Sequence, residues 1–226
     1  MSLICQNLIK TYRMGEVEVP ALRGCSLTVE DGAFTMLTGA SGCGKSTLLH
    51  CIAGVDRPDS GSIAIADTEI TGLSVSDMAV FRRRSIGLIY QFFNLIPSLT
   101  ILQNITLPLS LDGREPEREY FYALTNSLGI EGLLGRYPSQ LSGGQQQRCA
   151  IARALMAKPA ICLADEPTGN LDRKNTEEVI KLFREMKERF GQTILMVTHD
   201  SSLLGYGDRT VLMEDGLVIS DVAARV

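Results

Sequence analysis

The sequence contains no tryptophan, and aromatic residues make up only 6% of its 226 residues. Proteins that bind single-stranded nucleic acid stack bases on aromatic side chains, so no such platform is expected. Basic residues are not in excess either, because 22 Lys and Arg stand against 26 Asp and Glu, for a formal net charge of −4. A protein that holds duplex nucleic acid usually needs a basic surface. We therefore expect no nucleic acid partner.

The sequence also lacks paired cysteines and a secretory signal. Its six cysteines form no CxxC pair and match no zinc-binding spacing. A chain of this length can bury an adequate core without disulfides, so we expect reduced thiols. Residues 1–13 show no basic start followed by an apolar stretch, which is what a signal peptide requires. These absences predict a cytoplasmic protein.

Charge is missing altogether from residues 85–111. A segment of this length could cross a bilayer, which takes about 20 residues. Four amides and two prolines interrupt it, and their polar groups would each cost several kcal/mol in lipid; they are Gln91, Asn94, Pro97, Gln103, Asn104 and Pro108. We expect this segment not to span a membrane.

Apolar strand-like segments alternate with helical segments over much of the chain, which predicts an α/β fold whose parallel sheet is covered on both faces. Alternation and flanking turns predict strands at 3–9, 22–30, 34–38, 62–66, 160–164, 193–197, 209–213 and 217–220. Helical spacing and terminal signals predict helices at 47–53, 74–84, 115–128, 144–157 and 176–190. The middle of the chain is thus a helical insertion in an α/β core.

A glycine-rich segment between a predicted strand and a predicted helix fits the P-loop pattern G-x-x-x-x-G-K-[ST]; it is Gly39, Ala40, Ser41, Gly42, Cys43, Gly44, Lys45 and Ser46. Glycine permits the backbone angles that turn successive N–H groups toward a phosphate. Lys45 adds a charge for the β- and γ-phosphates, and Ser46 offers a hydroxyl to Mg²⁺. The alternative is a chance glycine-rich turn. We also expect the Cys43 thiol to be sensitive to alkylation and shielded by bound nucleotide.

Two acids follow a second apolar strand, as Asp165 and Glu166. The carboxyl ends of parallel strands meet near the phosphate loop. Asp165 is then placed to hold Mg²⁺ through water, and Glu166 to orient or deprotonate an attacking water. A solvated acidic pair at a strand end is the alternative. His199 closes a further strand and could contact the γ-phosphate, although an isolated histidine there is more often structural.

A second anion-binding helix start is predicted at 141–145, where Leu-Ser-Gly-Gly-Gln opens a helix. One nucleotide does not need two such cradles from distant parts of one chain. If two chains pair head-to-tail, each segment can face the phosphate loop of the other chain. The alternative is an ordinary helix start capped by Ser142.

Together these motifs resemble those of the nucleotide-binding subunits of ATP-binding cassette (ABC) transporters over nearly the whole chain. The remaining motifs of the resemblance are Gln91 after Ile-Tyr, Gly-Asn-Leu-Asp at 169–172 and Thr-His-Asp at 198–200. Further segments at 93–97, 107–109, 142–148 and 164–172 are similar to the branch of macrolide exporters, lipoprotein-release ATPases and antimicrobial-peptide efflux ATPases. Two residues depart from the usual pattern. Cys43 replaces the commoner small residue, and Gln103 replaces a glutamate, which puts one partner contact in doubt.

The resemblance implies ATP and Mg²⁺ as cofactors and assigns roles to single residues. Tyr12 would stack on adenine, and the P-loop with Thr47 would bind the phosphates. Gln91 would touch Mg²⁺ and sense a membrane partner. Glu166 would be the catalytic base and His199 the γ-phosphate switch, with Lys45 supporting catalysis. Two further groups would act between subunits, namely Ser142, Gly143, Gly144 and Gln145 in binding ATP in trans, and Asp172 in linking the two sites.

The resemblance also implies one ATPase domain over 1–226, with a RecA-like P-loop core. An N-terminal antiparallel β subdomain and this core would take up 1–90 and 158–226, and a helical subdomain 91–157. The expected partners are a second copy of the chain and a transmembrane permease subunit, which would hold the protein on the inner face of the cell membrane. An apolar groove for the permease would be lined by Phe92, Phe93, Leu95, Ile96 and Leu99.

Export of a drug, peptide or lipoprotein is the expected function, driven by ATP hydrolysis. Two alternatives stay open at this point. A soluble ABC-type ATPase would act without a membrane partner, although such proteins usually carry tandem cassettes or long extensions. A P-loop kinase or GTPase would not need Leu-Ser-Gly-Gly-Gln, and the sequence has no Asn-Lys-x-Asp guanine-reading motif.

Overall fold

A mixed six-stranded sheet forms the centre of the computed structural model, which describes residues 2–15 and 17–223. Its neighbouring strands are, in order, β10 (Leu217–Ala223), β9 (Arg209–Glu214), β3 (Phe34–Thr38), β8 (Ile194–Val197), β7 (Ile161–Asp165) and β6 (Ile86–Tyr90). Five of them run parallel, and only β10 pairs antiparallel, in the predicted hairpin with β9. The carboxyl ends of the five parallel strands therefore lie on the same side of the sheet.

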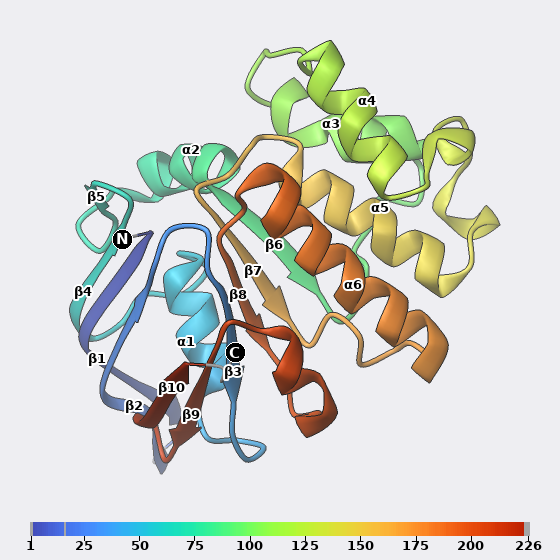
Figure 1. The fold of residues 1–226 in the computed structure, drawn as a ribbon. Coiled ribbons are helices and arrows are strands. Elements are labelled where there is room, and N and C mark those ends of the chain that lie inside the picture. The colour runs from blue at the N-terminus through green and yellow to red at the C-terminus, as the bar shows by residue number, and fades with distance from the viewer. Residues whose placement is uncertain (1, 16, 224–226) are drawn as a thin grey trace.

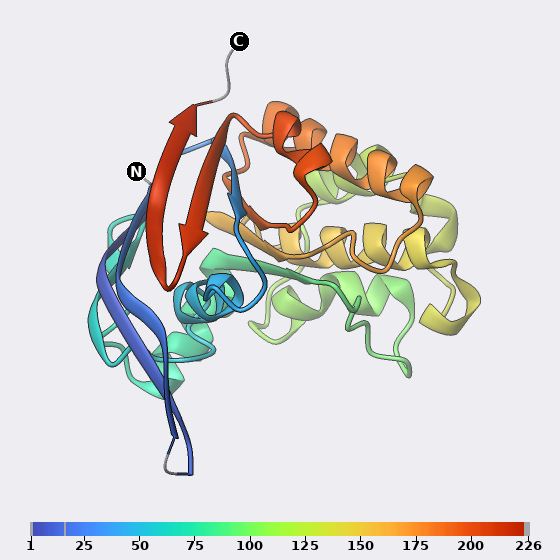
Figure 2. The ribbon, with the colours of Figure 1, turned by 90° about the horizontal axis from the view of Figure 1, so that it is seen from below.

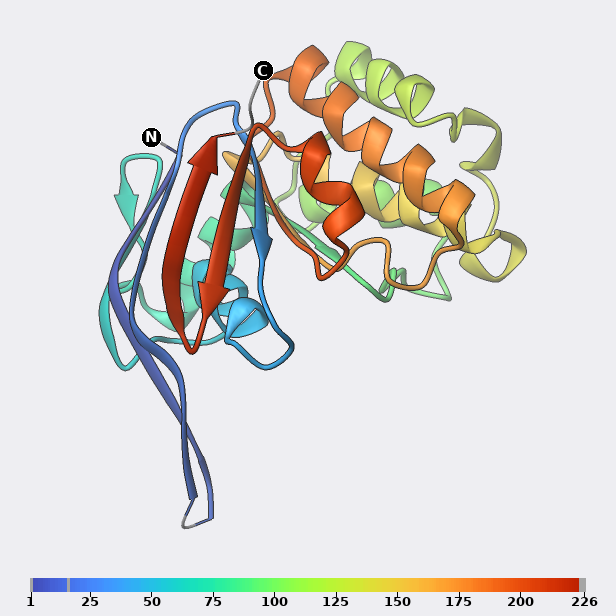
Figure 3. The same ribbon diagram turned by 60° about the horizontal axis from the view of Figure 1, so that its bottom comes forward.

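A second, antiparallel sheet lies beside the first (Figure 1). It consists of β2 (Val17–Val29), β1 (Leu3–Met14), β4 (Ser60–Ile65) and β5 (Thr68–Glu69), in that order. Figure 3 shows that the far end of the β1–β2 hairpin projects well beyond the rest of the molecule. Close to its turn, where Tyr12 pairs with Val19, this hairpin carries Tyr12 beside the cavity at the phosphate loop.

Helices cover both faces of the central sheet. Helix α1 (Lys45–Ile52) packs between the two sheets (Figure 2). The other helices are α2 (Val75–Ser85), α3 (Ile101–Ser110), α4 (Arg118–Ser127), α5 (Gly143–Leu155) and α6 (Arg173–Phe190), with short 3₁₀ turns η1 (Glu131–Leu133), η2 (Pro138–Gln140) and η3 (Ser201–Tyr206). Helices α3 to α6 gather on the side of the sheet opposite α1.

Strand β8 shows how the sequence builds both layers. Ile194 and Met196 point into the core formed with α3–α6, whereas Leu195 and Val197 point into the core around α1. Side chains alternate between the faces of a strand, so a strand with helices on both sides is apolar throughout. All four residues are at most 1% exposed. This is the parallel sheet, covered on both faces, that the sequence predicts.

The uncharged segment holds two elements that the sequence analysis missed, β6 and α3. Helix α3 begins at a capping box formed by Thr100 and Gln103. Asn104 is fully buried, and its side chain accepts from the Ile96 N–H at 2.7 Å and donates to the Leu99 carbonyl at 3.1 Å. Its amide therefore stabilises the turn before the helix. Among the described residues, no helix has both the length and the apolar character needed to cross a membrane.

The start of α6 also lies earlier than expected, at Arg173 instead of residue 176. Asp172 caps the helix by accepting a hydrogen bond from the Asn175 N–H at 2.9 Å. The same carboxylate accepts from the Asn175 side chain at 2.7 Å. These bonds lower the pKa of Asp172 below its usual value, because they stabilise its charged form. The cap thus stabilises the first turn of α6, where the loop from β7 ends.

Candidate functional site

The phosphate loop joins β3 to α1 and is held by backbone approaches that only glycine permits. Gly39 has φ of 152°, and a Cβ on it would lie 2.1 Å from the Met213 carbonyl oxygen. Gly44 has φ of 103°, and a Cβ there would lie 2.3 Å from the Ala21 carbonyl oxygen. These contacts press the loop against β9 and β2. The loop is therefore shaped before any ligand arrives.

Lys45 is buried inside this loop, with only 6% of its surface exposed. Its ammonium donates to the carbonyls of Gly39 at 2.9 Å and Ala40 at 2.8 Å. Within the described part of the chain it forms no ion pair with a carboxylate. Buried charges are normally paired, so this cation lacks an anion. The phosphate groups of a nucleotide would supply one.

The cavity beside the loop measures about 660 Å³ and is large enough for a nucleotide. The phosphate loop supplies part of its lining, and Tyr12, Val19 and Pro20 of the β1–β2 hairpin form the opposite wall. The Tyr12 hydroxyl donates to Asp56 at 2.8 Å, and Lys10 donates to the same carboxylate at 2.8 Å. Asp56 thus holds the Tyr12 ring beside the cavity, where it is available for stacking.

A site suited to Mg²⁺ lies where α1 meets the end of β7. The Ser46 hydroxyl donates to Asp165 at 3.2 Å, so two oxygen ligands lie side by side. Hydroxyl and carboxylate oxygens suit Mg²⁺, which also keeps water and phosphate ligands. Burial raises the pKa of Asp165 above its ordinary value, although the bond from Ser46 opposes this shift. In the described residues, no group of three or more His, Cys, Asp or Glu could hold a metal alone.

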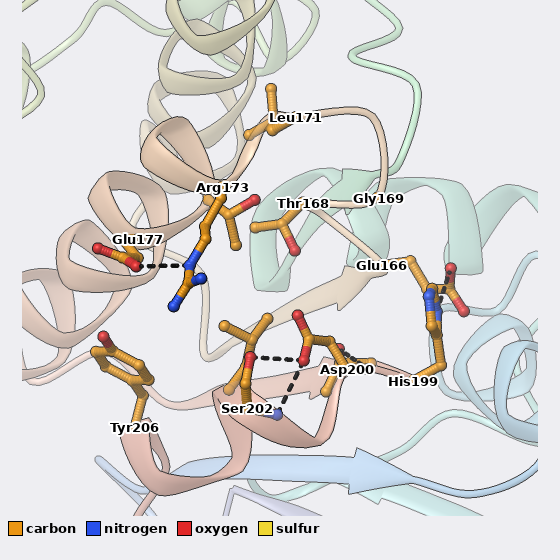
Figure 4. A pocket seen from close by; sticks show the side chains of 13 residues that line it. Glu166, Thr168, Gly169, Leu171, Arg173, Glu177, His199, Asp200, Ser202 and Tyr206 are labelled. Atoms are coloured by element: carbon orange, nitrogen blue, oxygen red, sulfur yellow. Dashed lines mark hydrogen bonds and ion pairs between the residues drawn. The ribbon is translucent and has the colours of Figure 1, made fainter.

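Glu166 follows Asp165 with a left-handed backbone, at φ of 46°. A residue other than glycine adopts this conformation at a cost of about 1 kcal/mol or more. Its N–H donates to the Val197 carbonyl at 3.1 Å, which ties it to β8. Its carboxylate lies 3.1 Å from Nδ1 of His199 (Figure 4). This pair lines the nucleotide cavity and a neighbouring cavity of about 690 Å³ between α6 and η3.

The 141–145 segment forms the capped helix start that the sequence allows. The Ser142 hydroxyl accepts from the Gln145 N–H at 3.4 Å, and the Gln145 side chain accepts from the Ser142 N–H at 3.0 Å. The first amides of the helix, at Gly143 and Gly144, have no acceptor within the helix. None of these residues lines the cavity beside the phosphate loop. The two anion-binding features are thus not brought together within one chain.

Gln91 lies at the end of β6, and the strand register sets its neighbour Tyr90 opposite Asp165. Its side chain nevertheless contacts the loop before α6, where Nε2 donates to Oδ1 of Asn170 at 3.3 Å. The structure therefore does not join Gln91 to the Ser46–Asp165 pair. Its role as a metal ligand stays a prediction.

Two residues of the site were missed by the sequence analysis, Asp56 and Asn170. Asp56 belongs to no motif that was singled out. Asn170 lies inside the Gly-Asn-Leu-Asp motif, in which only Asp172 was given a role. Cys43, in contrast, was singled out for reactivity. Its thiol is 7% exposed and lies 3.7 Å from the Lys45 ammonium, so burial opposes rapid alkylation. All six cysteines are buried and free.

Comparisons with known proteins agree with this geometry. The family model described as ABC transporter matches residues 22–169. The macrolide export ATP-binding/permease protein MacB of Rhodopirellula baltica is 43% identical over 97% of this chain, which spans only 33% of that protein. The lipoprotein-releasing system ATP-binding protein LolD of Cytophaga hutchinsonii is 42% identical, over 94% of this chain and 96% of its own length.

Solved structures give the same answer for the fold. The dimeric post-hydrolysis structure of the ATP-binding cassette MJ0796, bound to ADP and Pi, superposes with a TM-score of 0.88 at 38% identity. The alignment covers 99% of both chains. The predicted fold, a P-loop core with an antiparallel β subdomain and a helical insertion, is confirmed by this match.

We expect Asp165→Asn to raise the melting temperature of the nucleotide-free protein by a few degrees, because it removes a partly buried negative charge. If Asp165 holds Mg²⁺, the same change should weaken Mg²⁺-dependent ATP binding about 10-fold or more, since the carboxylate loses its charge. Thermal melts and titrations with and without EDTA measure both effects. Asp67→Asn, at an exposed position, is the matched control. A stabilised variant with wild-type Mg²⁺ dependence would contradict the metal assignment.

Acidification should mimic this substitution in the wild-type protein. Metal binding requires the ionised carboxylate, and burial raises the pKa of Asp165. Mg²⁺-dependent ATP affinity should therefore decline on lowering the pH before an ordinary aspartate would titrate.

Proposed function

The chain belongs to the ABC transporter family, and we propose that it is an ATP-hydrolysing subunit that drives a membrane transporter. The observation that carries this proposal is the buried Lys45 ammonium, which has carbonyl partners but no anion among residues 2–15 and 17–223, inside a preformed loop beside a nucleotide-sized cavity. ATP binding supplies the missing negative charge. Mg²⁺ held near Ser46 and Asp165 would neutralise the charge that develops on the phosphates.

Glu166 and His199 are the residues that we propose act on the reaction itself. Their 3.1 Å contact sets the Glu166 carboxylate at the wall of the nucleotide cavity. From there the carboxylate can accept a proton from, or orient, a water molecule. The imidazole of His199 can then hold Glu166 in place and contact the terminal phosphate.

A second copy of the chain completes the site in our proposal. The capped start of α5 carries Gly143 and Gly144, whose amides have no acceptor within the helix, away from the phosphate-loop cavity of its own chain. In a head-to-tail pair these amides would meet the nucleotide of the other copy. The related cassette MJ0796 was solved as a dimer, which supports this arrangement.

The proposed permease site is a groove of about 420 Å³ between α2, α3, α5 and β6. Leu88, Leu107, Pro108 and Leu111 contribute apolar surface, and Leu111 is 64% exposed. Arg82 and Arg153 also line the groove, and among the described residues their guanidiniums bond only to carbonyls. An apolar segment that carries a carboxylate would suit this lining. Such a partner would place the protein on the inner face of the membrane.

This groove differs from the one expected from sequence. Of the five residues proposed for it, Leu95 is buried in the helical core and Phe93 packs against that core. None of the five lines the groove that the structure contains. The names of relatives such as MacB and LolD support export of a macrolide-like drug or release of a lipoprotein, and export of a peptide rests on the resemblance of the sequence motifs alone. A soluble ABC-type ATPase without a membrane partner is the alternative.

We expect Glu166→Gln to bind ATP, to lose nearly all hydrolysis and to accumulate as a dimer. Nucleotide would remain intact between two copies, and each charge-assisted hydrogen bond to its γ-phosphate contributes about 1.5–3 kcal/mol. Light scattering with ATP, with ADP and without nucleotide measures the association. Glu115→Gln, on an exposed loop, is the control. A Glu166→Gln protein that binds ATP and stays monomeric would contradict the proposed dimer.

We expect Leu111→Glu to leave ATP binding unchanged and to reduce membrane association in the native host severalfold. The change adds charge to an exposed position in the groove, so it disturbs docking rather than folding. Leu217→Glu is the matched control, because β10 lies at the opposite edge of the sheet from β6. Membrane and soluble fractions are compared by immunoblot. Equal membrane binding by both variants would favour the soluble alternative or another docking surface.

A further inference from the structure

The side chain of Gln91 is held by a reciprocal contact with Asn170. Nε2 of Gln91 donates to Oδ1 of Asn170 at 3.3 Å, and Nδ2 of Asn170 donates to the Gln91 main-chain oxygen at 3.1 Å. Asn170 thus binds both the side chain and the backbone of the same residue. The contact joins the loop after β6 to the loop before α6.

Gly169 makes room for this contact. A Cβ at that position would lie 2.7 Å from Nε2 of Gln91, which is closer than real side chains approach. The Gln91 amide therefore lies directly against the backbone of Gly169. Any larger residue would push the amide away from Asn170.

The backbone after Gln91 is anchored separately, by α5. Arg153 donates to the Phe93 carbonyl at 3.0 Å and to the Asn94 carbonyl at 2.5 Å. The Phe93 ring lies against Gly143, where a Cβ would be 3.5 Å from it. The Gln91 side chain, in contrast, is only half-buried. The side chain can therefore change partner while the loop backbone keeps its place.

Gln91 directly follows the carboxyl end of β6, and the proposed Mg²⁺ ligand Asp165 lies at the carboxyl end of the neighbouring strand β7. Its neighbour Tyr90 pairs with Asp165 across β6 and β7. In the structure the Gln91 amide lies against Gly169 and donates to Asn170. It can turn toward the Ser46–Asp165 pair only by giving up this hydrogen bond.

We propose that Asn170 is a positioning residue that holds Gln91 away from the metal site until the loop before α6 moves. This inference rests on the proposed function, because it assumes that Mg-ATP binds beside Ser46 and Asp165 and that Gln91 adds a ligand there. Asp172, two residues further on, belongs to the loop proposed to meet a second copy. Contact between copies would displace this loop, free Gln91 and so complete the metal site.

Equilibrium binding of a fluorescent, non-hydrolysable ATP analogue tests the proposal, measured with Mg²⁺ and with EDTA at subunit concentrations below dimerisation. Asn170→Ala removes the competing hydrogen bonds, so Mg²⁺-dependent affinity should rise about 3- to 10-fold. Affinity in EDTA should not change, because the competition concerns the metal site. Asn126→Ala, on the exposed face of α4, is the matched control and should show no gain.

A double-mutant cycle assigns the effect to Gln91. In a Gln91→Ala background, Asn170→Ala should give no further gain in Mg²⁺-dependent affinity. The proposal is overturned if the single variant shows no gain, or if the same gain persists without the Gln91 side chain. Circular dichroism checks folding, and Asn170→Ser serves as a second variant with the same expected gain. If the wild-type protein fails to bind the analogue at all, the proposed function fails instead.

Discussion

The buried ammonium of Lys45 is the constraint on which the site depends. Close approaches of Gly39 to β9 and of Gly44 to β2 fix the phosphate loop, and the loop carbonyls hold the ammonium inside it. Carbonyl dipoles solvate this cation only in part, so a bound anion would lower the free energy of the loop. The surrounding elements then decide which anion. The β1–β2 hairpin provides an aromatic wall, and β7 and β8 bring the acid and the imidazole.

Three loops meet on the other side of this site and contact one another. Gln91 bonds to Asn170, and Phe93 and Leu171 both lie against Gly143. The start of α5 also approaches the start of α6 so closely that a Cβ on Gly144 would lie 2.5 Å from the Asn175 side chain. A displacement of one loop therefore has to be accommodated by the others. The proposed permease groove is lined in part by α5. These contacts therefore connect the groove to the nucleotide site.

Local motifs were predictable from the sequence because their chemistry is local. The phosphate loop, the acid pair after β7 and the cap at Ser142 each depend on residues adjacent in the chain. The sheet was predictable as well, since strands buried on both faces are apolar throughout. Helix α3 was missed because its cap lies within a polar, proline-containing run whose order depends on the buried Asn104.

Contacts between distant segments were out of reach of this reasoning. Asn170 and Gln91 are 79 residues apart, and nothing in the composition of either segment indicates that they bond. The residues expected to line a docking groove show the same limit for Leu95. The sequence alone does not distinguish an apolar residue that faces a partner from one that faces its own core. Leu95 faces the core.

The central claim is that each reaction centre is shared between two chains, and mixing two inactive variants tests it most directly. Lys45→Ala disables the phosphate loop, and Gly143→Asp disables the start of α5. In a mixed dimer one site carries both defects and the other carries none. The account predicts that each variant alone is inactive and that the mixture recovers ATP hydrolysis. A mixture as inactive as its two components, although mixed dimers form, would contradict it.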